Sequence, residues 1–75
     1  GRVETAHLHR LERLRERLLS NDEVLTELIA QHPGLDVQNL RTLIRNARKE
    51  KESNKPPKAY REIFQVLREL DTQSP

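Results

Sequence analysis

The chain has 75 residues, a net charge of +2 and no cysteine. This length allows one small domain, and the lack of cysteine excludes disulfide bonds and thiolate metal sites. The longest apolar runs are pairs or triplets, whereas a membrane-spanning helix needs about 20 apolar residues, so we expect no membrane span. The sequence starts at Gly1 rather than at a methionine, and we therefore expect a fragment of a longer protein.

Leucines at helical spacing predict a first helix over residues 3–19. Its apolar side carries Leu8, Leu11, Leu14 or Leu18, and Leu19. The opposite side carries an arginine stripe at i, i+3 and i+7, which consists of Arg10, Arg13 and Arg17. Because Glu12 and Glu16 flank this stripe at pairing distance on a helix, we interpret it as solvated and ion-paired rather than as a binding surface.

A second helix follows the break at Ser20-Asn21. Either residue can cap it, and Asp22 and Glu23 place negative charge in its first turn, where the helix dipole favours acids. Its apolar face consists of Val24, Leu25, Leu28 and Ile29. The sequence His32-Pro33-Gly34 ends it, because proline lacks a backbone donor and disfavours helix at the preceding residue.

Asp36 is a suitable N-cap for a third helix, whose apolar stripe consists of Val37, Leu40, Leu43, Ile44 and Ala47. Residues 48–55 contain no apolar side chain, so this helix either projects past its core contacts or frays there. Pro56-Pro57 ends it, and Pro57 fits the first position of a fourth helix.

The fourth helix has an apolar face of Tyr60, Ile63, Phe64, Leu67 and Leu70, and the residues from Asp71 onward predict a frayed tail. No segment shows strand-like alternation. The sequence therefore predicts an all-α fold, a small bundle of three to four helices that forms a single domain over residues 1–75. We expect a core of Leu and Ile, with Tyr60 and Phe64 filling the space under the third helix.

No sequence pattern favours catalysis, and we predict a protein that is not an enzyme and uses no cofactor, metal ion or small-molecule substrate. The chain lacks a recognisable catalytic triad, a glycine-rich phosphate loop and an HExxH metal motif. His7 and His9 point about 160° apart on a helix and so cannot share a metal ion through that element.

Positive charge is concentrated in one segment. Between Arg41 and Arg61 lie eight lysines and arginines and two glutamates, a charge of +6, whereas residues 1–40 and residues 62–75 each carry −2. Local positive charge attracts polyanions, among which nucleic acids are the most abundant in a cell. Arginine also binds phosphate in a bidentate manner, and the rigid Pro56-Pro57 pair would fix Lys55 and Lys58 in space.

Two other interpretations of this basic segment stay open. It is either a surface that binds another protein or a solvated face that only keeps the protein soluble. If the partner is a nucleic acid, the absence of aromatic stacking platforms argues against readout of single-stranded bases. Recognition of the backbone and shape of structured RNA then fits the composition better.

The segment LRTLIRNARKEKESNKPPKAYREIFQVLREL, residues 40–70, resembles the C-terminal part of the YjgA/DarP family of bacterial ribosome-associated proteins. The run RNARKEKESNKPPKAYREIF is long and idiosyncratic, and the preceding HRLERLRERLLSNDEVLTELIAQHPGLDVQNL resembles the family more loosely. The resemblance implies an all-helical, non-catalytic, cytoplasmic protein that joins the large ribosomal subunit during late assembly. It also implies that residues 1–75 are the C-terminal part of a longer protein.

The resemblance and the charge together give ten candidate RNA-binding residues: Arg41, Arg45, Asn46, Arg48, Lys49, Lys51, Asn54, Lys55, Lys58 and Arg61. The expected partners are large-subunit ribosomal RNA and precursor particles of the 50S subunit, with ribosomal proteins as further candidates. The alternative is a protein–protein interaction module that docks a ribosomal protein or another assembly factor.

Overall fold

The computed structural model describes residues 1–73, which form four helices and no strand. Helix α1 spans Arg2–Ser20, α2 spans Asp22–Gln31, α3 spans Val37–Glu52 and α4 spans Lys58–Gln73. The all-α class and the number of helices predicted from the sequence are confirmed. No helix within the described range is both long enough and apolar enough to cross a membrane.

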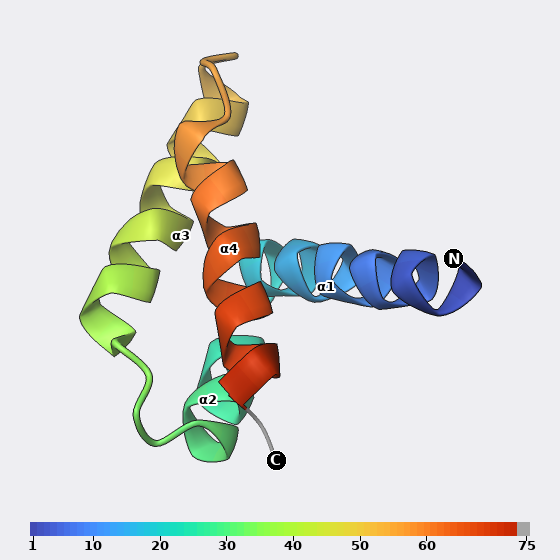
Figure 1. The fold of residues 1–75 in the computed structure, drawn as a ribbon. Helices are drawn as coiled ribbons and strands as arrows, with labels where there is room; N and C mark the ends of the chain where they lie inside the picture. The colour runs from blue at the N-terminus through green and yellow to red at the C-terminus, as the bar shows by residue number, and fades with distance from the viewer. Residues whose placement is uncertain (74–75) are drawn as a thin grey trace.

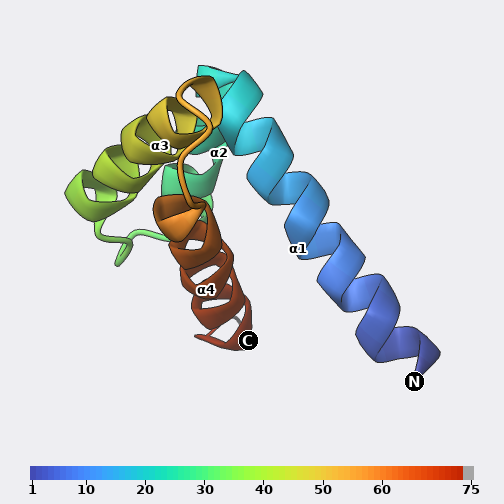
Figure 2. The ribbon, with the colours of Figure 1, turned by 90° about the horizontal axis from the view of Figure 1, so that it is seen from above.

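Helices α3 and α4 form an antiparallel hairpin, which is the most extensive helix pair of the fold (Figure 1). Helix α1 crosses this hairpin, and α2 lies near the C-terminal end of α4. Seen from above, the N-terminal half of α1 runs outward from the other helices (Figure 2). This arrangement leaves the outer side of the hairpin without a covering helix.

The core contains apolar side chains from every helix. It consists of Leu11, Leu18, Val24, Leu28, Leu40, Leu43, Ile44, Ala47, Ala59, Ile63 and Leu67. All of them except Ala59, which the sequence analysis did not include, lie on the predicted apolar stripes. Leu8 differs, because 40% of its surface is exposed where α1 extends past the bundle.

The two aromatic residues also differ from the prediction. Tyr60 and Phe64 pack against the core but are only half-buried at its margin, where both face Arg15 of α1 and the Tyr60 ring also lies beside Lys51 of α3. The reason is that they lie on the side of α4 that α1 crosses, whereas Ala59 and Ile63 occupy the buried side.

The predicted caps form as expected. The Asn21 side chain accepts a hydrogen bond from the amide of Glu23 at 2.9 Å, and the Asp36 side chain accepts one from the amide of Asn39 at 3.0 Å. These bonds satisfy amides in the first turns of α2 and α3 that have no partner within the helix.

The prediction of a frayed tail is wrong for residues 71–73, which continue α4. The Asp71 carboxylate lies 3.0 Å from Nε2 of His7 and 3.1 Å from the guanidinium of Arg10. These contacts attach the last turn of α4 to α1, and the pattern of apolar residues could not reveal them. The remaining part of the predicted tail, residues 74–75, lies outside the described range.

Candidate nucleic-acid interface

The junction between α3 and α4 is a tightly closed turn. The amide of Lys55 donates to the carbonyl of Glu50 at 2.9 Å, and the amide of Asn54 donates to the carbonyl of Lys51 at 3.5 Å. This is the hydrogen-bond pattern of a Schellman motif, which needs a left-handed residue at its centre. Asn54 supplies it with a φ of 53°. Asparagine tolerates this conformation better than other non-glycine residues, so the backbone of this candidate residue has a structural role.

Glu50 closes the same junction from the other side. Its carboxylate accepts hydrogen bonds from the amides of Ala59 at 2.7 Å and Tyr60 at 3.1 Å. These amides belong to the first turn of α4, where a negative charge also interacts favourably with the helix dipole. Glu50 therefore holds the end of α3 against the start of α4, and the segment between them contains Lys55 and Lys58.

Six of the ten candidate residues are exposed cations that form no ion pair within residues 1–73: Arg41, Arg45, Lys49, Lys55, Lys58 and Arg61. They lie along α3, at the junction and on the first turn of α4. Asn46 and Asn54 are also exposed. A cation without a carboxylate neighbour keeps its charge available to an incoming anion.

The other two candidates are engaged inside the fold. Arg48 donates from Nε to the carbonyl of Leu19 at 3.0 Å and from one terminal nitrogen to Asp22 at 3.1 Å. The Lys51 ammonium lies 3.3 Å from a carboxylate oxygen of Glu16. Arg48 thus links α3 to the corner between α1 and α2, and Lys51 links α3 to α1.

Three of the candidate arginines line one cleft. Arg41, Arg45 and Arg48 face α2 across a cleft of about 360 Å³, whose other polar residues are Asp22 and Thr26. Arg41 and Arg45 form no ion pair there with any described residue, because Asp22 pairs with Arg48. The junction lies farther along α3, about 20 Å from Arg41 at 1.5 Å per helical residue. The candidates therefore form an extended basic track rather than one compact cluster.

Beside this track lies a cluster that sequence reasoning missed. The guanidinium of Arg15 stacks over the Tyr60 ring at 3.7 Å from its centroid, and the Tyr60 hydroxyl donates to Glu16 at 2.5 Å. This hydrogen bond is the main reason that the pKa of Glu16 lies below its ordinary value and that the pKa of Tyr60 lies above its own. The cluster joins α1 to α4.

The arginine stripe of α1 is only partly ion-paired, and its partners are not those predicted. Arg10 contacts Asp71 of α4, and Arg17 lies 3.8 Å from Glu27 of α2. Arg13 forms no ion pair within the described chain. The arginines of this stripe that form ion pairs therefore do so with acids of α2 and α4, not with the predicted Glu12 and Glu16 of their own helix.

Arg68 is an exposed cation that the sequence interpretation left out, since it lies beyond the basic segment. It follows Arg61 at a spacing of seven residues, which places both on one side of α4. That spacing was the signal available in the sequence, and it extends the basic track along α4.

Comparison with known proteins gives a consistent result. Residues 1–68 match the family model described as "Dual-action ribosomal maturation protein DarP". A protein of that name from Cupriavidus metallidurans is 54% identical over 68 residues, which cover 91% of this chain and 34% of the relative. Its namesake from Pasteurella multocida is 57% identical over 65 residues, covering 87% of this chain and 36% of the relative.

A third relative of the same name, from Paraburkholderia xenovorans, is 54% identical over 71 residues, or 95% of this chain and 35% of the relative. The chain therefore spans about a third of the length of the curated relatives it matches. No solved structure shows significant similarity to it.

Proposed function

The chain belongs to the family of the dual-action ribosomal maturation protein DarP, and on this premise we propose that it binds large-subunit ribosomal RNA during late assembly of that subunit. In this proposal the domain is non-catalytic and acts in the cytoplasm on precursor particles. Its contribution is to hold structured RNA through the phosphate backbone.

One observation carries the proposal: exposed cations without carboxylate partners follow α3 and continue through a rigid junction into α4. Phosphate contacts from arginine and lysine supply most of the affinity of such interfaces and fix the orientation of the protein. A junction closed by Glu50 presents Lys55 and Lys58 at defined positions, which reduces the entropy lost on binding.

The contacts also rank the ten candidates. Arg41, Arg45, Lys49, Lys55, Lys58 and Arg61 are assigned the phosphate contacts, with Asn46 as an uncharged donor. Arg48 and Lys51 are assigned mainly to the folded structure, since their charges already face Asp22 and Glu16. Asn54 is assigned to the turn, because its left-handed conformation closes the junction.

Two triple variants test the proposal with equal loss of charge. The first changes Arg45, Lys55 and Lys58 to alanine, and the second changes Arg10, Arg13 and Arg17 to alanine. Filter binding to large-subunit ribosomal RNA measures their affinities, and circular dichroism verifies that both remain helical. We expect the first variant to lose roughly tenfold or more in affinity, because each lost cation forfeits a phosphate contact.

The second variant should retain RNA affinity within about threefold, since its arginines lie outside the track. Equal affinity of the two variants would assign RNA binding to another part of the longer protein. A first variant that is unfolded would be replaced by Lys55→Gln and Lys58→Gln, which leave the helical part of α3 unchanged.

A further inference from the structure

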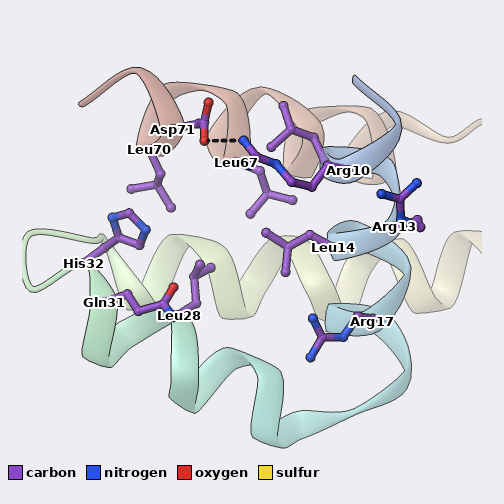
Figure 3. A pocket seen from close by; sticks show the side chains of 11 residues that line it. Arg10, Arg13, Leu14, Arg17, Leu28, Gln31, His32, Leu67, Leu70 and Asp71 are labelled. Atoms are coloured by element: carbon purple, nitrogen blue, oxygen red, sulfur yellow. Dashed lines mark hydrogen bonds and ion pairs between the residues drawn. The ribbon is translucent and has the colours of Figure 1, made fainter. Parts of the chain in front are cut away.

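A pocket of about 470 Å³ lies between α1, α2 and α4, and α3 runs behind it without contributing a lining residue (Figure 3). Its apolar lining consists of Leu11, Leu14, Leu28, Leu67 and Leu70. Leu11, Leu28 and Leu67 are core residues, whereas Leu14 is half-buried. The core of the bundle therefore reaches the surface here as a floor of leucines.

The rim of this pocket is cationic on one side. Arg10, Arg13 and Arg17 follow one another along α1, and His32, Gln31 and Asp71 lie across the pocket from them (Figure 3). With three arginines and one aspartate, the lining carries +2. Arg13 forms no ion pair with a carboxylate within residues 1–73, so it is available to pair with an acidic ligand.

This combination selects one class of ligand. A floor built only of leucine side chains offers no hydrogen-bond partners for the edges of bases and no aromatic ring for stacking, so it suits nucleic acid poorly. An amphipathic helix fits both parts, because it places apolar side chains in a groove and presents acids at the edge of its apolar face. The excess of positive charge on the rim requires that these edge residues be acidic.

We propose that the pocket docks an acidic amphipathic helix of a partner polypeptide. Leucine-like side chains of that helix enter between α1, α2 and α4, and its carboxylates pair with Arg13 and with Arg17, whose own partner Glu27 lies at the long distance of 3.8 Å. The proposal does not depend on RNA binding. Both the pocket and the basic track reach α4, but they share no residue, so we expect RNA on the track and the polypeptide in the pocket to bind at the same time.

The test uses a synthetic helical peptide with leucines along one face and glutamates along both borders of that face. Two control peptides have lysine in place of glutamate, or serine in place of leucine. Titration of the ¹⁵N-labelled 75-residue chain should shift the amide signals of Leu14, Leu28 and Leu67 with the first peptide only. The Arg13→Glu variant should bind this peptide about tenfold more weakly, as expected for reversing a charge opposite a carboxylate.

Arg41→Glu is the matched control variant, because it reverses an exposed and unpaired arginine on α3. Arg41→Glu should bind the peptide as the unmodified chain does and bind RNA more weakly. Arg13→Glu should bind the peptide more weakly and bind RNA as the unmodified chain does. The proposal would be overturned by equal binding of the glutamate and lysine peptides, or by shifts confined to other amides. Equal losses of affinity for the glutamate peptide in the two variants would also overturn it.

Two further results would replace the partner with another occupant. Sedimentation of the chain alone could reveal a dimer that Arg13→Glu disperses, in which case a second copy fills the pocket. Large-subunit RNA could shift the same pocket amides and bind Arg13→Glu as poorly as Arg41→Glu, in which case the pocket belongs to the RNA surface. Either result refutes docking of an acidic partner helix.

Discussion

Helices α1 and α3 both carry arginines at helical spacing, yet the two sets have different surroundings. On α1, Arg10 contacts Asp71, Arg15 lies over Tyr60 and Arg17 faces Glu27. On α3, Arg41 and Arg45 have no such partner. The cause is where acids lie on the neighbouring helices. Asp71 of α4 and Glu27 of α2 reach the arginines of α1, whereas Asp22, the acid that lines the cleft between α2 and α3, pairs with Arg48. Whether an arginine is available for binding therefore depends on the helices around it.

The two acids of the basic segment, Glu50 and Glu52, differ most clearly in their hydrogen-bond partners, and their substitution should give the largest difference in stability. Glu50 accepts two hydrogen bonds from α4, whereas Glu52 is exposed and has no partner within the described chain. We expect Glu50→Ala to lower the free energy of unfolding by about 2 kcal/mol, since two amides at a helix start lose a charged acceptor. The melting temperature should fall by roughly 10 °C for a domain of this size.

Glu52→Ala is the control and should change stability by no more than about 0.5 kcal/mol. Similar melting temperatures for the two variants would show that Glu50 does not hold the junction. Because the junction positions Lys55 and Lys58, Glu50→Ala should also weaken RNA binding despite making the protein more positive.

Arg48 and Arg45 differ in role, because Arg48 is bonded within the fold whereas Arg45 has no ion-pair partner within residues 1–73 and is available to bind phosphate. Arg48→Ala should lower the free energy of unfolding by about 1 kcal/mol, because it removes the bonds to the Leu19 carbonyl and to Asp22. This figure allows for the side chain being 42% exposed, which weakens its ion pair. Arg45→Ala should cost less than about 0.5 kcal/mol. Urea unfolding of both variants checks this, and the reverse order would exchange their assigned roles.

Tyr60→Phe should lower the free energy of unfolding by only about 0.5 kcal/mol, since its partner Glu16 is half-exposed and solvent weakens the lost hydrogen bond. The ring and its contact with Arg15 remain. The pKa of Glu16 is lowered from 4.5, mainly by the hydrogen bond from the Tyr60 hydroxyl. The stabilisation of the folded state by this bond is therefore fully present above pH 4.5 and disappears as the pH falls through the folded-state pKa of Glu16.

The pKa of Tyr60 is raised from 10.0, mainly by its hydrogen bond to Glu16. The stabilisation of the folded state by this bond is therefore fully present below pH 10.0 and disappears as the pH rises through the folded-state pKa of Tyr60. The free energies of unfolding of the unmodified chain and of the Tyr60→Phe variant, measured by urea unfolding, should therefore differ most near neutral pH. In strong acid and in strong base the two should be equally stable. A difference that does not vary with pH would rule out the hydrogen bond as its source.

Much of the fold could be predicted because local signals agree with it. Asn21 and Asp36 cap helices as their side chains predict, and Leu40 and Ile63 lie at the centre of buried stripes. The contacts of Asp71 and Glu50 could not be predicted, because each depends on how two helices cross. The sequence contained these acids but no information about which amide or arginine they would meet.

The same limit applies to the candidate site. The charge of the segment identified α3 and the junction, but it could not separate Arg45 from Arg48, which lie three residues apart. Only the position of Leu19 and Asp22 distinguishes them. Arg13 was interpreted as part of a solvated stripe, since a leucine floor beside it appears only when α1, α2 and α4 are packed together.

The salt dependence of RNA affinity tests the central claim, that unpaired cations of α3 and the junction bind phosphate. If each of the six assigned cations neutralises one phosphate, log K against log salt concentration should have a slope of about −4 to −5. The variant lacking Arg45, Lys55 and Lys58 should show a slope shallower by about 2 to 3, whereas the variant lacking Arg10, Arg13 and Arg17 should keep the original slope. A slope near zero, or one that both variants change equally, would contradict the account.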